Sequence, residues 1–294
     1  MAEKPVILIV DDAASNLQLL AQLLKDDYRI KVANNGPKAL ELAQTGPDLI
    51  LLDIVMPDMD GYEVCKQLKN NEKTNSISVI FITGKTGADD EERGLMLGAV
   101  DFITKPIRPA IVMARVKTHI TIIQQHQQLQ HLATRDQLTE IFNRRYLLDV
   151  AAQKMARAKR HGNALSMIML DVDHFKAIND QHGHAVGDVV LREIAAILDS
   201  SCRAEDVAAR MGGEEFILLL DCCNISDCQN KAERLRQQIE QLMPQTILVT
   251  ASFGIAEYSP EDNDFESFFN RVDKALYTAK NNGRNQVVVG SLAL

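Results

Sequence analysis

The chain has 294 residues, 46% of them hydrophobic and 24% charged, and its formal net charge is −8 at pH 7. This length and composition favour two soluble domains over one, and the acidic balance argues against a general affinity for nucleic acid or anionic lipid. No apolar run has the length of a membrane span, no secretory signal is recognisable, and the five scattered cysteines suit reduced thiols, so we expect a cytoplasmic protein without membrane insertion.

Strand and helix patterns alternate along the first third of the chain. The opening run PVILIV is apolar at every position, which is typical of a parallel strand buried on both faces. Further strands are expected at residues 30–32, 48–52, 79–82 and 101–103, and helices at 15–26 and 37–44. Alternation of this kind predicts a doubly wound parallel sheet, and therefore an α/β fold for this part.

Reactive side chains follow the carboxyl ends of these strands, at the edge where open parallel sheets bind ligands. They are Asp11, Asp12, Asp53, Thr83 and Lys105. Three carboxylates gathered there cannot all stay ionised without a divalent cation, and Mg²⁺ accepts oxygen ligands while leaving positions open for water and phosphate. The lysine and the hydroxyl complete a pocket for a transferred phosphoryl group. Solvated loop acids would explain one or two of these positions, but not all five.

The blocks IVDD, LLDIVMPDMDGYE, FITG and DFITKP resemble, in this order, the receiver domain of two-component response regulators. The likeness covers about residues 5–123, and we place the domain at 1–123. It implies a flavodoxin-like fold and a histidine kinase or phosphotransfer protein as the phosphoryl donor. By this resemblance Asp53 is the phosphoacceptor, and Mg²⁺ is bound by Asp11, Asp12 and Asp53.

The same resemblance implies the parts of a switch. Lys105 would contact the phosphoryl group, Thr83 would move toward the new phosphate, and Phe102 takes the position of the family's switching aromatic residue. The peptide bond between Lys105 and Pro106 is expected to be cis, which would aim the lysine.

A connecting helix or stalk is expected over residues 107–136, where it overlaps the last receiver helix. Val112, Val116, Ile120 and Ile123 fall at helical spacing, and the sequence then turns polar with QQHQQLQHLATRDQ. Two interpretations stay open, a single solvated spacer helix and a parallel dimeric stalk, because the a/d pattern is short and interrupted.

The second half presents acids at the ends of two apolar strands. A helical pattern reaches about residue 161, a strand is expected at 164–170, and a helix at 186–199. Asp171 and Asp173 follow this strand, and RMGGEEF leads directly into another apolar strand. A hairpin turn with its acids in water would explain RMGGEEF on its own.

A metal site is the alternative for these acids. If the two strands are neighbours, Asp171 meets Glu214 and Glu215, and the three carboxylates can share ions that polarise an α-phosphate. Lys280 and Arg284, near the end of the chain, would then meet the phosphate charge of a nucleotide.

The blocks DQLTEIFNRR, LDVDHFKAINDQHGHAVGD, RMGGEEF and ALYTAKNNGRN resemble the GGDEF family of diguanylate cyclases. The likeness covers about residues 132–290, and we place this domain at 132–294. It implies an α+β fold with a mainly antiparallel central sheet, like the palm of nucleotide cyclases. The implied activity condenses two GTP into cyclic di-GMP and two pyrophosphates. Two such domains must face each other for this reaction, so a homodimer is expected.

The resemblance also implies residue roles in this domain. The ligands of Mg²⁺, with Mn²⁺ as the alternative ion, would be Asp171, the Val172 carbonyl, Glu214 and Glu215. Glu214 and Lys280 would be catalytic. GTP would contact Asn179, Asp188, Gly212, Gly213, Lys280 and Arg284. An ionised Asp188 only accepts hydrogen bonds, which suits the N1–H and 2-amino groups of guanine and penalises adenine.

Upstream of RMGGEEF, Arg203 and Asp206 form the RxxD pattern that marks an inhibitory product site in this family, with Arg210 as an added contact to the product's phosphates. Glu140 departs from the family pattern, which has glycine there, so a positive φ would cost more in this chain. The sequence therefore predicts a response regulator whose phosphorylation controls a diguanylate cyclase subject to product inhibition. The alternatives are a catalytically silent domain that binds GTP or cyclic di-GMP, and a cyclase with a different product.

Overall fold

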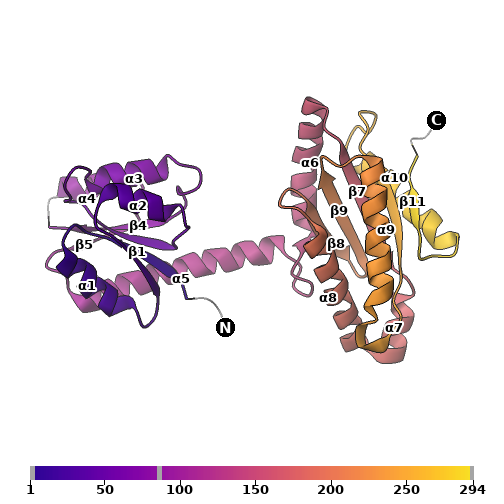
Figure 1. The fold of residues 1–294 in the computed structure, drawn as a ribbon, viewed down its shortest axis with the longest axis horizontal. Helices are drawn as coiled ribbons and strands as arrows, with labels where there is room; N and C mark the ends of the chain where they lie inside the picture. Colours follow the sequence, from indigo (N-terminus) through magenta and orange to yellow (C-terminus); the bar gives the residue numbers. More distant parts are fainter. Residues whose placement is uncertain (1–3, 85–87, 292–294) are drawn as a thin grey trace. The chain divides into compact units, whose positions relative to one another are not determined.

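The computed structural model describes residues 4–84 and 88–291, without the side chains of residues 88–91. The chain divides into two compact units, Met1–Gln128 and Leu129–Leu294. The division falls within one helix, which carries the chain from the first unit into the second (Figure 1). Each unit has its own sheet, with a hydrophobic core on each face of it.

The first unit is a parallel five-stranded sheet with helices on both faces, as the alternating pattern predicts. Its strand order is β2-β1-β3-β4-β5, and every neighbouring pair runs parallel. The strands are β1 (Val6–Val10), β2 (Arg29–Ala33), β3 (Leu49–Asp53), β4 (Ser78–Thr83) and β5 (Asp101–Thr104). The helices are α1 (Ala14–Leu24), α2 (Gly36–Ala43), α3 (Gly61–Lys69), α4 (Ala88–Met96) and α5 (Pro109–Thr134).

Alternate residues of these buried strands enter two different cores. Leu8 and Val10 of β1 pack toward α2 and α3, whereas Ile7 and Ile9 pack toward α1 and α5. Because both faces are covered, β3 is buried along its whole length and ends at Asp53. The helix α3 was not expected from the sequence. It begins after a loop with one proline and two aspartates, where Asp60 caps it by accepting from the backbone N–H of Glu63 at 2.8 Å.

The connecting helix α5 is 26 residues long. Val112, Val116 and Ile120 are buried against the sheet of the first unit, which confirms the helical spacing of these positions. The apolar side chains of Ile122 and Leu129, further along, are exposed by 53% and 65%. Within the two described ranges we find no helix whose length and hydropathy would suit the crossing of a bilayer.

The second unit has a six-stranded mixed sheet with the order β11-β10-β7-β9-β8-β6. The four central strands pair antiparallel, and the outer pairs β6–β8 and β10–β11 are parallel, so the mainly antiparallel sheet is confirmed. The strands are β6 (Phe142–Asn143), β7 (Leu165–Val172), β8 (Val207–Gly212), β9 (Glu215–Asp221), β10 (Ala251–Glu257) and β11 (Val287–Val289). The helices are α6 (Arg144–His161), α7 (Phe175–His182), α8 (His184–Ser201), α9 (Ile225–Leu242) and α10 (Phe265–Asn281), with a short 3-10 turn at Pro244–Thr246.

This sheet also sends alternate residues to two cores. Phe216 and Leu218 of β9 pack toward α8 and α9, whereas Ile217 and Leu219 pack toward α6 and α10. Helix α10 lies directly on β10, because a Cβ added at Gly254 would stand 2.3 Å from the carbonyl oxygen of Val272. This close approach fixes the helix that carries Lys280 against the sheet.

Candidate functional site

In the first unit, three acids converge beyond the ends of β1 and β3. Asp11, Asp12 and Asp53 each offer a carboxylate oxygen, and these oxygens lie within 4.8 Å of one another. Asp11 and Asp53 are buried, while Asp12 is exposed. Three carboxylates at this spacing fit an oxygen-seeking divalent cation with one side open to solvent.

Lys105 supplies the positive charge of this cluster. Its Nζ lies 2.7 Å from Oδ2 of Asp53 and 3.3 Å from Oδ2 of Asp11, and the peptide bond to Pro106 is cis, as expected. Burial raises the pKa of Asp53, against the lowering effect of its hydrogen bond from Lys105. Burial alone would lower the pKa of Lys105, but the bond to Asp53 raises it overall.

Asn16 is a site residue that the sequence analysis missed. Its Nδ2 donates to both carboxylate oxygens of Asp11, at 3.0 and 2.9 Å, and the backbone N–H of Ala13 donates to the same carboxylate at 2.9 Å. These bonds orient Asp11 from the start of α1. No local pattern marks an asparagine in this position, since its partner is set by the turn between β1 and α1.

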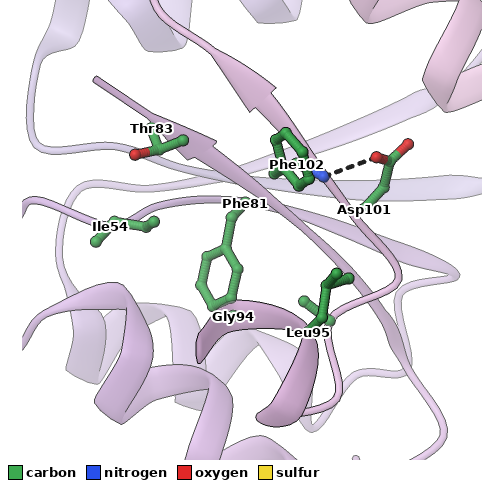
Figure 2. A pocket seen from close by; sticks show the side chains of 8 residues that line it. Ile54, Phe81, Thr83, Gly94, Leu95, Asp101 and Phe102 are labelled. Atoms are coloured by element: carbon green, nitrogen blue, oxygen red, sulfur yellow. Dashed lines mark hydrogen bonds between the residues drawn. The ribbon is translucent and has the colours of Figure 1, made fainter. Parts of the chain in front are cut away.

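Thr83 and Phe102 lie on the neighbouring strands β4 and β5 and line a small pocket with Ile54 and Leu95 (Figure 2). Thr83 is 2% exposed, and Phe102 is partly exposed. Figure 2 shows Phe81 turned toward α4, where its ring fills the space above Gly94.

Asp101 links this pocket to α5. Its carboxylate accepts from the backbone N–H of Phe102 at 2.8 Å, from Arg115 Nη1, and pairs with His119 Nε2 at 3.0 Å. Burial would raise the pKa of Asp101, but the hydrogen bonds from Arg115, His119 and Phe102 lower it overall. The Arg115 guanidinium also lies 5.8 Å from the centroid of the Phe102 ring. A movement of Phe102 would therefore disturb contacts of α5.

In the second unit, β7 and β9 are antiparallel neighbours, with Asp171 directly opposite Glu215. The backbone N–H of Val172 donates to the carbonyl of Glu214 at 3.3 Å. Gly213 and Glu214 form the turn between β8 and β9. The hairpin and the gathering of acids, which the sequence analysis treated as alternatives, are thus two aspects of one structure.

Lys280 stands against these acids. Its Nζ lies 2.8 Å from Oδ2 of Asp171. Burial raises the pKa of Asp171, against the lowering effect of Lys280, and the charge of Glu214 adds to the rise. Burial also raises the pKa of Glu215, and the charge of Asp171 adds to it. Two carboxylates, Asp171 and Glu215, whose pKa burial and neighbouring acids raise beside a lysine fit a site that receives further positive charge.

The acids of the second unit are less tightly convergent than those of the first. Within the part of the chain that the structure describes, no second group of three acid, histidine or cysteine side chains brings its ligand atoms within 4.8 Å of one another. Glu215 and Lys280 line a hollow of about 300 Å³ together with Asp273, Lys274, Leu276 and Tyr277 of α10.

The glycines of RMGGEEF have the backbone that the turn requires. Gly212 has φ 145° and Gly213 has φ 54°, in the region that only glycine adopts cheaply. A Cβ added at either would meet no atom within 4 Å. The turn is therefore open on its outer side, where a ligand can approach the backbone.

The two residues expected to bind the base lie on paired helices. Asn179 is on α7, Asp188 is on α8, and both are half-buried. Gly187 permits this pairing, because a Cβ there would stand 2.0 Å from Oδ1 of Asn179. Gly187 was not predicted from the sequence as a site residue, although it directly precedes Asp188 in the block HAVGD.

Arg203 and Asp206 line a second hollow, of about 610 Å³, with Lys231 and Arg234 of α9. The Asp206 carboxylate accepts from the backbone N–H of Arg203 at 3.0 Å and pairs with Lys231 at 3.3 Å. Sequence reasoning missed Lys231 and Arg234; their spacing of three places them on one face of a helix.

Arg210 makes contacts within its own domain. Its guanidinium donates twice to the carbonyl of Gly213, at 3.0 and 2.7 Å, and pairs with Asp136 at 2.9 Å. It thereby ties the glycine turn to the block DQLT at the start of the domain. A contact between Arg210 and a product stays a prediction.

Glu140 has a φ of 62°. This positive value costs more for glutamate than for the glycine that the family pattern has at this position. Its carboxylate pairs with His131 Nε2 at 2.7 Å, and its carbonyl accepts from Arg135 Nη1 at 3.1 Å. These bonds to the last turn of α5 and the residue after it offset the backbone strain.

We expect Asp53→Asn to stabilise the protein toward urea in the absence of divalent cations, and the gain to grow as the pH rises. The pKa of Asp53 is raised above its ordinary value of 3.8, so ionising this carboxylate costs folded stability from about that pH up through the raised folded pKa. Asparagine does not titrate. Urea midpoints at about pH 5 and about pH 8 measure the effect. Asp26→Asn, at an exposed carboxylate, is the matched control. A stability gain confined to acid pH would contradict the account.

Two family models match the chain. The model described as the diguanylate cyclase GGDEF domain matches residues 133–286, and that of the response regulator receiver domain matches residues 7–117. The response regulator PleD of Caulobacter vibrioides is 33% identical in an alignment that covers 96% of this chain and 65% of PleD. The chain thus spans somewhat less than two thirds of that relative's length.

Solved structures resemble the second unit. The coiled coil and GGDEF domain of DgcB from Caulobacter crescentus, in complex with cyclic di-GMP, is 30% identical with a TM-score of 0.56, covering 61% of this chain and 98% of that one. The active GGEEF domain of a diguanylate cyclase from Vibrio cholerae is 36% identical with a TM-score of 0.50, covering 51% and 98%. The chain belongs to the GGDEF family of diguanylate cyclase domains, and a receiver domain of the response regulator type precedes its GGDEF domain.

Proposed function

We propose that this protein is a diguanylate cyclase, which condenses two GTP into cyclic di-GMP and releases two pyrophosphates. The observation that carries the proposal is the meeting of Asp171 with Glu215 across β7 and β9, with Glu214 in the adjoining turn and Lys280 against Asp171. Its setting is a chain that belongs to the GGDEF family.

The acids hold the metal in this proposal. The ligands of Mg²⁺ or Mn²⁺ would be Asp171, Glu214, Glu215 and the carbonyl of Val172, and the bound ion would polarise the α-phosphate and lower the pKa of the attacking 3′-hydroxyl. Glu214 accepts the proton of that hydroxyl as the bond to phosphorus forms and pyrophosphate leaves. Lys280 balances negative charge at the reacting phosphates.

The remaining contacts orient GTP. The open turn at Gly212 and Gly213 lies against the phosphates, and Arg284 grips their terminal end. Asn179 and Asp188 bind the base. A carboxylate that accepts two hydrogen bonds from guanine would face the N1 lone pair of adenine, so ATP is disfavoured.

A homodimer follows from the reaction, because the 3′-oxygen of each GTP must attack the α-phosphate held by another domain. The exposed apolar residues Ile122, Leu129 and Leu132 of α5 support a dimeric stalk. They are seven and three positions apart, which is the a, a, d spacing of a short coiled-coil seam. This arrangement favours the stalk over a solvated spacer helix.

Phosphorylation controls the dimer in this proposal. A histidine kinase or phosphotransfer protein supplies the phosphoryl group, Asp53 accepts it, and Asp11 and Asp12 complete the Mg²⁺ site. Thr83 and Lys105 then contact the new phosphate. The contacts of Asp101 with Phe102 and Arg115 support a route to α5. A dimer formed through α5 raises the effective concentration of one half-site for the other.

In this proposal, product inhibition acts through the hollow lined by Arg203 and Asp206. Arg203, Asp206, Lys231 and Arg234 would bind cyclic di-GMP there, because arginines fork to guanine edges and phosphates while the carboxylate accepts from N1–H. We place these reactions in the cytoplasm, which suits the five free thiols.

Purified protein incubated with Mg²⁺ and GTP should form cyclic di-GMP, identified by chromatography. Glu214→Gln should lower the rate by about a hundredfold or more, because glutamine neither accepts the proton nor binds the metal as a carboxylate does. Glu261→Gln, at an exposed position of the same domain, is the control. Binding of GTP without turnover would instead support a silent binding module, and a cyclic mononucleotide or mixed dinucleotide a different cyclase.

The same assay tests the product site. Added cyclic di-GMP should slow the wild-type enzyme and leave Arg203→Ala at its starting rate. Equal inhibition of both proteins would remove the proposed role of this hollow.

Beryllofluoride, which mimics a phosphoryl group on aspartate, should raise the rate of the wild-type enzyme by about tenfold, within the ordinary range of allosteric coupling. Asp53→Ala should lose this stimulation because it lacks the acceptor carboxylate, whereas Asp26→Ala should keep it. Equal stimulation of wild type and Asp53→Ala would refute the coupling.

A further inference from the structure

Asp173 lies two residues beyond Asp171, and the contacts of its carboxylate indicate a different role. Asp173 is 4% exposed. Its Oδ1 accepts from the hydroxyl of Ser252 at 2.6 Å, and its Oδ2 accepts from the hydroxyl of Thr250 at 2.8 Å and from the backbone N–H of Asn285 at 3.1 Å. A carboxylate engaged by three protein donors suits a structural tie better than a metal ligand.

The backbone N–H of Asn285, which donates to Asp173, belongs to a turn with unusual φ values. After α10, Gly283, Arg284 and Asn285 have φ values of 109°, 64° and 43°. Arginine and asparagine pay for such backbone with steric strain, so the conformation persists only when surrounding bonds over-determine it. The N–H of Arg284 donates to the carbonyl of Ala279 at 3.0 Å, and the next N–H along the chain is the one that Asp173 accepts.

Asn285 is held from its other side by α9. Arg236 Nη1 donates to its Oδ1 at 2.8 Å, and its Nδ2 donates to Glu240 Oε1 at 2.9 Å. Arg236 also pairs with Glu240 at 2.9 Å, and its side chain is 14% exposed. Asn285 is therefore held through its backbone N–H by Asp173, the residue after β7, and through its side chain by α9, and both contacts act on the residue that follows Arg284.

We propose that Asp173 and Asn285 are positioning residues for the nucleotide, which fix Arg284 relative to Asp171 so that the arginine meets the terminal phosphates. The inference rests on the proposed function, since it takes GTP as the ligand. The side chain of Asp173 then joins the end of the strand that bears Asp171 to the turn that bears Arg284. Because Asp173 lies only two residues beyond Asp171, just after the end of β7, one short segment fixes the turn of Arg284 relative to the metal-binding acid.

The test compares nucleotide affinities, so that it does not depend on turnover. Asn285→Gly removes the side-chain clamp but keeps the N–H and suits a positive φ, while Asp173→Asn leaves one oxygen for three donors. Each should weaken the binding of a GTP analogue that cannot be cleaved at the α-phosphate by about tenfold, the loss expected for one charge-assisted contact. Affinity for GMP, which lacks the terminal phosphates, should change less than about twofold.

Ser252→Ala is the matched control. It removes a hydrogen bond from the same carboxylate without touching the turn, so its affinity for the analogue should stay within about twofold of the wild type. In an Arg284→Ala background, Asp173→Asn and Asn285→Gly should add less than about twofold, because the side chain that they position is gone. In the cyclase assay the same variants should raise KM and leave kcat within about threefold.

Several results would overturn the inference. Unchanged affinity for the GTP analogue in Asn285→Gly would do so, as would an equal loss for GMP, or an undiminished loss in the Arg284→Ala background. Circular dichroism reports whether Asp173→Asn is folded, and if it is not, Asn285→Gly decides. Product formation by the wild type judges the proposed function separately. A wild type that binds the analogue without turnover still permits the comparison, and one that does not bind it ends both proposals.

Discussion

The structure depends on one electrostatic constraint, which is that carboxylates gathered at the ends of buried strands repel one another and are poorly solvated. Both units meet this constraint in the same way, with a lysine from a distant segment. Lys105 lies between Asp53 and Asp11 in the first unit, and Lys280 lies against Asp171 in the second. Burial raises the pKa of Asp53 and of Asp171, so one lysine compensates only part of the cost. A site in this condition gains free energy when a divalent cation arrives.

A second constraint comes from the contacts that α5 and the residues after it make with each unit. Helix α5 begins on the receiver sheet, where Arg115 and His119 pair with Asp101 beside Phe102. At its other end the chain enters the GGDEF domain through Asp136, which pairs with Arg210, and Arg210 holds the carbonyl of Gly213. Each end of the connection thus contacts a residue next to a candidate site. In the proposed function, a change at Asp53 reaches α5 through Phe102 and Asp101, and the pair of Asp136 with Arg210 joins the residues after α5 to the turn of Gly213.

The sequence predicted those features that have a local or periodic signature. Continuous apolar runs identified most of the parallel strands, and acids at strand ends marked both candidate sites. The sequence left open whether β7 and β9 are neighbours, and the pairing of Asp171 with Glu215 shows that they are. The cis bond before Pro106 followed from the family pattern, which also marked position 140 as one where a positive φ costs more for glutamate than for glycine.

What the sequence analysis missed depends on partners far apart in the chain. Asp173 and Asn285 are separated by 112 positions, and Arg210 and Asp136 by 74. No window of residues contains both members of such a pair, so a strand-end acid such as Asp173 looks the same as Asp171 until its donors are known. The same reason hid Lys231 and Arg234, whose relation to Arg203 exists only after α9 has packed on the sheet.

The most direct test of the central claim is a crystal structure of the protein with Mn²⁺ and an uncleavable GTP analogue, in which anomalous scattering locates the metal. The account predicts Mn²⁺ on the carboxylates of Asp171 and Glu214, with the amine of Lys280 withdrawn from Asp171 toward the phosphates. Nucleotide bound at the turn of Gly212 and Gly213 with no metal on these acids, and with the pair between Lys280 and Asp171 intact, would contradict it.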